Sequence, residues 1–459
     1  MISVNSNSIM PIGYVRPANL SKSNNPDCKA PEGFKPSKLN FTSNTVAPEI
    51  RTSLSTKEEK EQYKVLSQYL DKEGKETLNA TLKTGKLLNN NSNDKSSVLD
   101  NLYKMTTTKR AEGLEPNLVL KDTLTTIYNP HTITQKFGNI PDTYKPDVIN
   151  TLTNNSKNLI QRKKSEYELD NLFSGCCVAA SEEFNLAQKK PAEFARFAEG
   201  LTSTNKSVEK SIKFDSLSNN TLDAIWLLDS FEIPYEAKDF NSAKIKLAPD
   251  NNAYTRAQIQ EKFRDNQERS PIDVLMQSTF MNVGSQQTYN SLNDKRGGKF
   301  SNEDSGLIDY EKTFLESVVE DKNVMSVTYQ NVDENQKLVG YTTDYDTVKS
   351  QILETLNRDK NIIIGYTITD ENKKIIGAHE ITIIGSKTDK DGNLSFICND
   401  TDDDVSAPIE YPATYIIPKI HHAGIPEDIA SRTLDQTDTW RLNLRYFNKM
   451  KQNSDTKKL

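Results

Sequence analysis

Hydrophobic positions recur at helical spacing in the first part of the chain. From residue 56 to about 165, Leu, Ile and Val return every three or four residues, which predicts helices with a thin apolar stripe. Ser55 with Glu58 resembles a capping box at the start of this region. The same spacing predicts further helices over 177–189, 192–200, 221–228, 271–281, 309–319 and 345–356.

The spacing changes to a period of two near residue 324, which is typical of strands. We expect strands over 324–329, 362–369, 379–385 and 394–398, with a hairpin turn at 389–393 between the last two. Helices that come first and strands that come later describe an α+β domain. The predicted fold class is therefore α+β, with a helical half followed by an antiparallel β half.

Four segments are expected along the chain. Residues 1–55 are rich in Asn, Ser, Pro and Lys and show no sustained period, so they are predicted to be a disordered arm. Residues 56–165 form the helical region, which we interpret as a spacer or as an inhibitory pro-segment. The main domain is expected over 166–445, and residues 446–459 form a polar tail.

Composition narrows the choice of partners. The net charge of −6 leaves no basic excess to neutralise phosphates, which argues against nucleic acid as a partner. No segment approaches the ~18 apolar residues of a membrane span, and no signal peptide is visible. The default expectation is therefore a cytoplasmic protein, although export by a route that needs no N-terminal signal stays open.

The candidate chemistry begins at the adjacent residues Cys176 and Cys177, directly before a run of helix formers. The positive end of a helix dipole favours the thiolate, which is the nucleophilic form of cysteine. A nucleophilic thiol also needs a base that a third group orients. His379 heads one predicted strand and Asn399 ends the next, so we predict Cys177 as nucleophile, His379 as base and Asn399 as the orienting group.

At these residues the chain resembles the papain-like cysteine peptidases, as a divergent member of the papain superfamily. Residues 174–181 read Ser-Gly-Cys-Cys-Val-Ala-Ala-Ser, similar to the family segment Cys-Gly-Ser-Cys-Trp-Ala-Phe-Ser, with Cys177 in the nucleophile's place. The segments 379–385 and 396–401 are similar to the family's His and Asn strands. The resemblance covers 166–445 and implies a papain-like two-subdomain fold. It also implies a peptidase that acts on a protein or peptide through an acyl-enzyme on Cys177, without a cofactor.

The chain departs from the family pattern at three places. The family's oxyanion-hole Gln is replaced by Asn171, which we expect to act together with the Cys177 backbone N–H. Cys176 replaces a Ser and is an alternative nucleophile. Asp400 and Thr401 stand where the family has a Trp. The Asp run of Asp400, Asp402, Asp403 and Asp404 offers an alternative third member, although we interpret it as a solvated loop.

Several alternatives remain at this point. The same three residues also suit a transglutaminase-like acyl transferase or a deamidase, because all these reactions pass through an acyl-thiol. A catalytically inactive papain-fold binding protein is the alternative from another class, because the family's Gln and Trp are missing. No metal site is expected: His421 and His422 are adjacent, and neighbouring side chains on a strand point apart.

Overall fold

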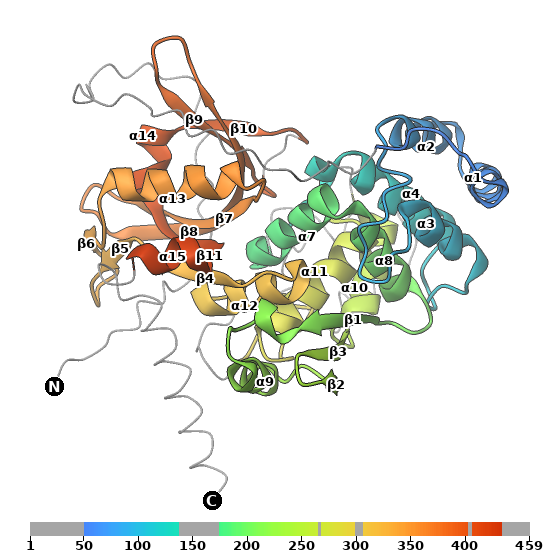
Figure 1. Cartoon of the computed structure of the whole chain (residues 1–459), viewed down its shortest axis with the longest axis horizontal. Coiled ribbons are helices and arrows are strands. Elements are labelled where there is room, and N and C mark those ends of the chain that lie inside the picture. Colours follow the sequence, from blue (N-terminus) through green and yellow to red (C-terminus); the bar gives the residue numbers. More distant parts are fainter. Residues whose placement is uncertain (1–49, 137–173, 265–267, 299–305, 403–405, 434–459) are drawn as a thin grey trace, which may run out of the picture.

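The chain folds into a helical part and a sheet part that lie side by side (Figure 1). The computed structural model describes residues 50–136, 174–264, 268–298, 306–402 and 406–433. The predicted α+β class is confirmed. Most of the expected arm and the whole of the expected tail lie outside the described residues, as does the expected boundary near residue 166.

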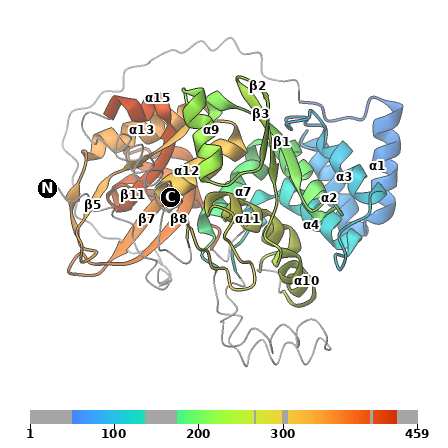
Figure 2. The same ribbon diagram turned by 90° about the horizontal axis from the view of Figure 1, so that it is seen from below.

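The N-terminal helices lie at the end of the molecule farthest from the large sheet (Figures 1 and 2). Thr56, not Ser55, caps the first helix, because its side chain accepts from the Glu59 backbone while Glu59 accepts from the Thr56 backbone. The predicted capping box is thus wrong by one residue. The elements are α1 (Lys57–Tyr69), α2 (Lys72–Lys83), α3 (Val98–Thr107), α4 (Pro116–Tyr128) and the 3₁₀ turn η1 (Pro130–Thr132).

Except for α10, which was not predicted, the central helices follow the sequence prediction to within a few residues. Two of them begin with Pro at the first helical position, where a missing N–H costs nothing. They are α7 (Cys177–Lys189), α8 (Pro191–Thr202), α9 (Thr221–Ser230), α10 (Ala253–Phe263), α11 (Pro271–Gly284) and α12 (Asp309–Glu320). Helix α12 packs on both α7 and β4, so it joins the helical part to the sheet part.

A small antiparallel sheet occupies a stretch for which the sequence predicted no strands. Its strands are β1 (Val208–Lys213), β2 (Tyr235–Asp239) and β3 (Ser242–Leu247), in the order β1-β3-β2. Strand β1 alternates strictly between buried and exposed positions. One inward position is Lys210, whose ammonium group is buried and donates to the Val319 carbonyl at 2.7 Å. A charged residue at a core position hid the alternation.

The large sheet has six strands in the order β10-β9-β8-β7-β11-β4, and all of its pairs are antiparallel. The predicted helix over 345–356 is α13 (Tyr345–Asn357), which packs against β7, β8 and β11. The strands are β4 (Val324–Thr328), β7 (Ile362–Thr369), β8 (Ile375–Thr388), β9 (Leu394–Asn399), β10 (Ile409–Pro412) and β11 (Ile420–Pro426). A separate hairpin joins β5 (Gln330–Val332) to β6 (Leu338–Tyr341).

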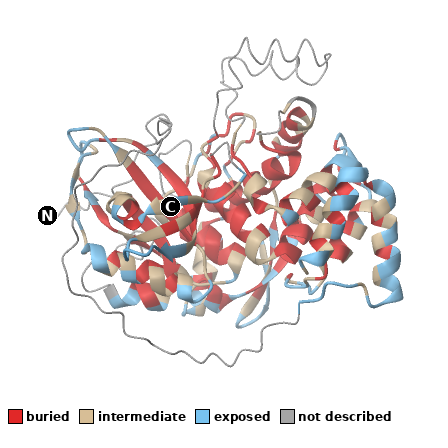
Figure 3. Ribbon diagram, turned by 90° about the horizontal axis from the view of Figure 1, so that it is seen from above, coloured by how far each residue is buried: buried red, intermediate tan, exposed pale blue. Residues whose placement is uncertain are grey.

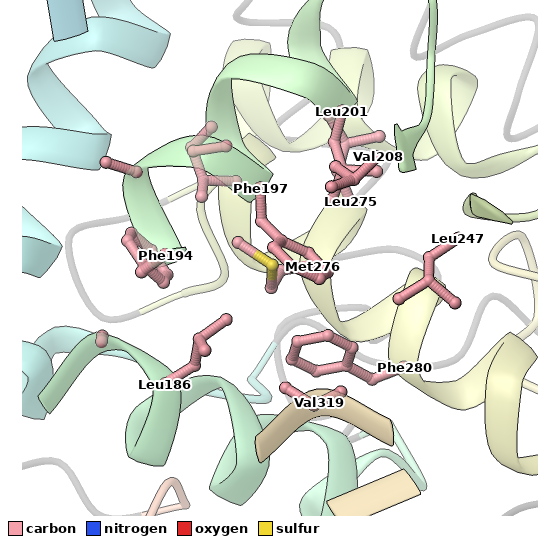
Figure 4. Packing of buried hydrophobic residues seen from close by; sticks show 14 of the residues in the cluster. Leu186, Phe194, Phe197, Leu201, Val208, Leu247, Leu275, Met276, Phe280 and Val319 are labelled. Carbon is pink, nitrogen blue, oxygen red and sulfur yellow. The ribbon is translucent and has the colours of Figure 1, made fainter. Parts of the chain in front are cut away.

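One hydrophobic core runs through the whole helical part, and the six-stranded sheet has a second core. The first core joins residues of α3, such as Leu102, to Phe194 and Phe197 of α8. Figure 4 shows its centre, and Figure 3 shows buried positions running from the N-terminal helices to the sheet. The N-terminal helices are therefore packed like an integral element of the helical part. Whether any of this region acts as a pro-segment stays a prediction.

Within the described ranges, each helix falls short of the length or the apolarity that crossing a bilayer demands.

We predict that the N-terminal and central helices unfold together. Leu102 is 0% exposed, so Leu102→Ala should lower the free energy of unfolding by about 2–5 kcal/mol. Leu118 is 41% exposed, so Leu118→Ala should change it by no more than about 0.5 kcal/mol. Urea unfolding, followed by the fluorescence of Trp226 in a Trp440→Phe background, checks this. An unchanged Trp226 transition in Leu102→Ala would show that the N-terminal helices fold separately.

Candidate functional site

The two adjacent cysteines occupy different environments because they lie at the start of a helix. Cys177 is the first residue of α7 and is half-buried, whereas Cys176 is the preceding cap residue and is fully buried. Successive residues of a helix are rotated by about 100° around its axis, so their side chains point in different directions. Cys176 provides no side-chain cap. The first N–H groups of α7 are therefore not occupied by its thiol.

The Cys176 thiol is buried and contacts polar side chains. Its S–H donates to Gln277 Oε1 at 3.0 Å, and its sulfur also contacts the Ser174 hydroxyl. Burial raises the pKa of Cys176 to about 12. The thiol therefore stays protonated at neutral pH, which argues against Cys176 as the alternative nucleophile.

A buried ion pair between Arg269 and Asp294 packs against Cys176 at the start of α7. Arg269 Nη1 lies 3.8 Å from Cys176 Sγ, and the same guanidinium donates to Asp294 at 3.0 Å. Asp294 is 0% exposed and also accepts from the Tyr289 hydroxyl at 2.6 Å. This buried carboxylate, with donors from Arg269 and Tyr289, fixes the segment that packs against Cys176.

His379 lies on β8, is 4% exposed and contacts both a carboxylate and a thiol. Its Nε2 donates to Asp400 Oδ1 at 2.7 Å, and its side chain also hydrogen-bonds Cys177. Because Nε2 is engaged with Asp400, Nδ1 is the ring nitrogen that remains for the Cys177 sulfur. The structure thus brings together Cys177 and His379, two of the three predicted catalytic residues.

His379 and Asp400 each stabilise the charged form of the other. Burial opposes protonation of His379, but Asp400 and Cys177 outweigh it and raise the pKa of His379 to about 10. Burial likewise opposes ionisation of Asp400, yet the pKa of Asp400 is lowered because His379 lies beside it. The ion pair stabilises the fold most above the unfolded carboxyl pKa of about 4 and below the unfolded imidazole pKa of about 6.5. Its contribution is lost as the pH rises through about 10 or falls through the lowered pKa of Asp400.

Asn399 does not contact His379 in this structure, contrary to the predicted geometry. Asn399 pairs with Thr382 across the two strands, and directly paired residues face the same side of a sheet. Thr382 is three residues from His379, so Asn399 faces the opposite side, and the next residue, Asp400, reaches the imidazole. Asn399 Oδ1 instead accepts from His131 Nδ1 at 2.7 Å.

The segment after η1 lies beside this site. Gln135 N donates to the Thr401 carbonyl at 3.1 Å, and the Gln135 carbonyl accepts from Ser174 N at 3.4 Å. The segment thus links the residue after Asp400 to the chain leading into α7. Neither His131 nor Gln135 was predicted to belong to the site. His131 contacts Asn399, and Gln135 contacts Thr401, each across more than 200 residues of sequence. No local sequence pattern indicates such contacts.

The predicted oxyanion-hole amide of Asn171 lies outside the described residues. Of the predicted oxyanion donors, the structure therefore places only the backbone N–H of Cys177, at the first position of α7.

A second polar cluster lies on the same sheet. His421 and His422 were expected to point apart, but the pairing of β11 with β7 shifts between Ile420 and His422. This bulge inserts one extra residue, so both imidazoles lie on one side of the strand, with their Nδ1 atoms 2.9 Å apart. Together with Asp309 they form a group that could hold a metal ion.

A pocket of about 300 Å³ lies between α9, α12 and β4, with Trp226 and Tyr310 in its wall. Neither Cys177 nor His379 lines it. We therefore place the candidate chemistry at the cysteine–histidine contact, because reacting groups must lie within hydrogen-bond reach of each other.

Comparison of the chain with protein-family models, with curated proteins and with solved structures found no match.

We predict that iodoacetamide distinguishes the two adjacent thiols. With a pKa of about 12, roughly one Cys176 in 10⁴ is thiolate at pH 8, and its sulfur is also buried. Cys177 should therefore react at least about 100-fold faster than Cys176 or buried Cys398, as measured by peptide mass spectrometry. Denaturation should remove the difference. Equal labelling of both adjacent cysteines in the native protein would contradict this placement.

We predict that Asp400 keeps His379 protonated. Asp400→Asn removes the carboxylate that favours the imidazolium, so the pKa of His379 should fall clearly below about 10. The titration of the His379 ring signal by NMR measures this, with a His379→Gln variant to assign the signal. Asn399→Ala is the matched control and should leave the midpoint unchanged. The reverse pattern would restore Asn399 as the orienting residue.

Proposed function

We propose that this protein is a thiol-dependent hydrolase of papain-like arrangement, which cleaves peptide bonds through an acyl-enzyme on Cys177. The observation that supports the proposal is the position of the His379 imidazole, in contact with both Cys177 and Asp400. Thiol catalysis needs a nucleophile that contacts a base, and a third group that contacts and orients the base.

Each residue has a defined role in the proposed reaction. The Cys177 thiolate attacks the carbonyl carbon, and the His379 imidazolium then gives its proton to the leaving amine. Asp400 holds the imidazole by its Nε2–H and stabilises its positive charge. Water, deprotonated by His379, attacks the acyl-thiol and releases the second product. Asp400 thus takes the place that the sequence gave to Asn399.

The start of α7 suits the developing oxyanion. The N–H of Cys177 belongs to the first turn of the helix, where no intrahelical acceptor exists. Such N–H groups and the positive end of the helix dipole stabilise negative charge on the carbonyl oxygen.

The arrangement of the two parts also agrees with the proposal. The helical part provides Cys177 at the beginning of α7, and the sheet part provides His379 from β8 and Asp400 just beyond β9 (Figure 1). The resemblance to papain-like peptidases implies this division between two subdomains.

Acyl transfer is the alternative within the same chemistry. An acyl-thiol reacts with water, with an amine or with another nucleophile, and the three side chains are the same in each case. The decisive quantity is the product formed when a primary amine competes with water.

We predict that the full chain cleaves members of a mixed peptide library and that Cys177→Ala abolishes this activity. Asp400→Asn should lower kcat/KM on the order of 10²–10⁴-fold, because the imidazole loses its orientation and charge partner. Cys176→Ala and Asn399→Ala serve as matched controls, since each removes a neighbouring side chain that hydrogen-bonds elsewhere, Cys176 to Gln277 and Asn399 to His131. They should keep activity within about tenfold if folded.

Three outcomes would change the proposal. Loss of activity in Cys176→Ala alone, with circular dichroism unchanged, would move the nucleophile to Cys176. Amide products in the presence of a primary amine, without free acid, would identify an acyl transferase. No turnover, together with slow alkylation of Cys177, would favour the catalytically inactive binding protein.

A further inference from the structure

The second polar cluster gathers three ligand atoms from two elements. His421 and His422 lie on β11, and Asp309 is the first residue of α12. The two Nδ1 atoms are 2.9 Å apart, and Asp309 Oδ1 is 3.4 Å from His422 Nδ1. All three ligand atoms lie within 4.8 Å of one another. Ligands at 2.0–2.1 Å from a tetrahedral zinc ion are about 3.3 Å apart, so the cluster needs little adjustment to hold one.

A second observation points to the same centre. His422 Nε2, on the far side of the ring from the cluster, lies 2.9 Å from Glu380 Oε1. A histidine that binds a metal through one nitrogen usually donates its other N–H to a carboxylate, which fixes the tautomer and strengthens the metal bond. Asp309 is supported similarly, because its Oδ2 accepts from the Thr328 hydroxyl at 3.2 Å.

The sheet makes room for this arrangement. Glu380, Gly365, His422 and Thr328 form one row across β8, β7, β11 and β4, so they face the same side. A Cβ atom at Gly365 would lie 2.3 Å from His422 Cε1 and 2.5 Å from Glu380 Oε1. Because Gly365 has no side chain, the Glu380 carboxylate and the His422 imidazole can approach each other over its Cα atom.

We propose that Asp309, His421 and His422 bind a divalent first-row transition metal of the zinc class, with Glu380 as the outer carboxylate that orients His422. Two imidazoles and one carboxylate suit zinc, cobalt or iron(II). Calcium and magnesium prefer oxygen ligands only. The side chain of Asp309 is 25% exposed, which leaves a route for the ion and a place for water as a further ligand.

One neighbouring cation bears on the charge of this site. Lys312 Nζ lies 3.6 Å from Glu380 Oε2, so its charge is directed at the outer carboxylate. In this structure the two imidazoles share a hydrogen bond between their Nδ1 atoms, 2.9 Å apart. A metal ion replaces that hydrogen bond with two metal–nitrogen bonds, and binding measurements distinguish the two arrangements.

The test uses the full chain in a Cys177→Ala background, because the Cys177–His379–Asp400 group could itself bind zinc. After dialysis against EDTA, we expect one equivalent of Zn²⁺ by isothermal titration calorimetry. We also expect the visible bands of tetrahedral Co²⁺, and no binding of Mg²⁺ or Ca²⁺. His421→Gln and Asp309→Asn should abolish binding at micromolar metal. Glu380→Gln should weaken it by about 10–100-fold.

His131→Gln is the matched control, since it removes a histidine of the helical part, and it should bind Zn²⁺ like the parent. Circular dichroism confirms the fold of each variant, and Asp309→Asn covers the case in which a histidine variant fails to fold. The proposal is overturned if the folded parent takes up less than one equivalent at 100-fold molar excess. It is also overturned if Asp309→Asn and Glu380→Gln both bind as tightly as the parent.

Discussion

The hydrogen bond from His379 Nε2 to Asp400 Oδ1 is the contact on which the candidate site depends. It fixes the imidazole so that the other ring nitrogen is left for Cys177, and it holds a positive charge in a place where burial alone would remove it. Strand β9 ends at Asn399, so Asp400 is the first residue after the strand, and from there its carboxylate reaches His379. The geometry of the sheet therefore decides which residues act together.

Much of the helical part could be predicted because its helices carry an apolar stripe and clear capping residues. Helix α7 was predicted with its observed bounds, and α11 and α13 to within a few residues. Cys177 and His379 could be found for a related reason, since a thiol at a helix start and a lone histidine on a strand have local signals. The strands of the small sheet could not, because Lys210 interrupts the apolar alternation of β1.

The failures at Asn399 and at His421–His422 share a physical cause. Both depend on which side of a sheet a residue faces, and that side changes with a shift of one residue in the pairing. The register of β8 with β9 places Asn399 away from His379, and a bulge in β11 places two adjacent histidines on one side. Neither the register nor a bulge leaves a signal in a single sequence, whereas residue type and helical spacing do.

Strand β8 carries His379 and Glu380 next to each other, one facing the cysteine and the other facing the His422 imidazole. If the strand shifted by one position so that His379 took the place of Glu380, the imidazole would lie beside Lys312 and His422, and Ala378 would face the cysteine. Such a misthreaded molecule would retain nearly all of its backbone pairing while losing both polar centres at once. The native register alone places the Glu380 carboxylate and the His422 imidazole together over Gly365, where a Cβ atom would lie 2.5 Å from the first and 2.3 Å from the second.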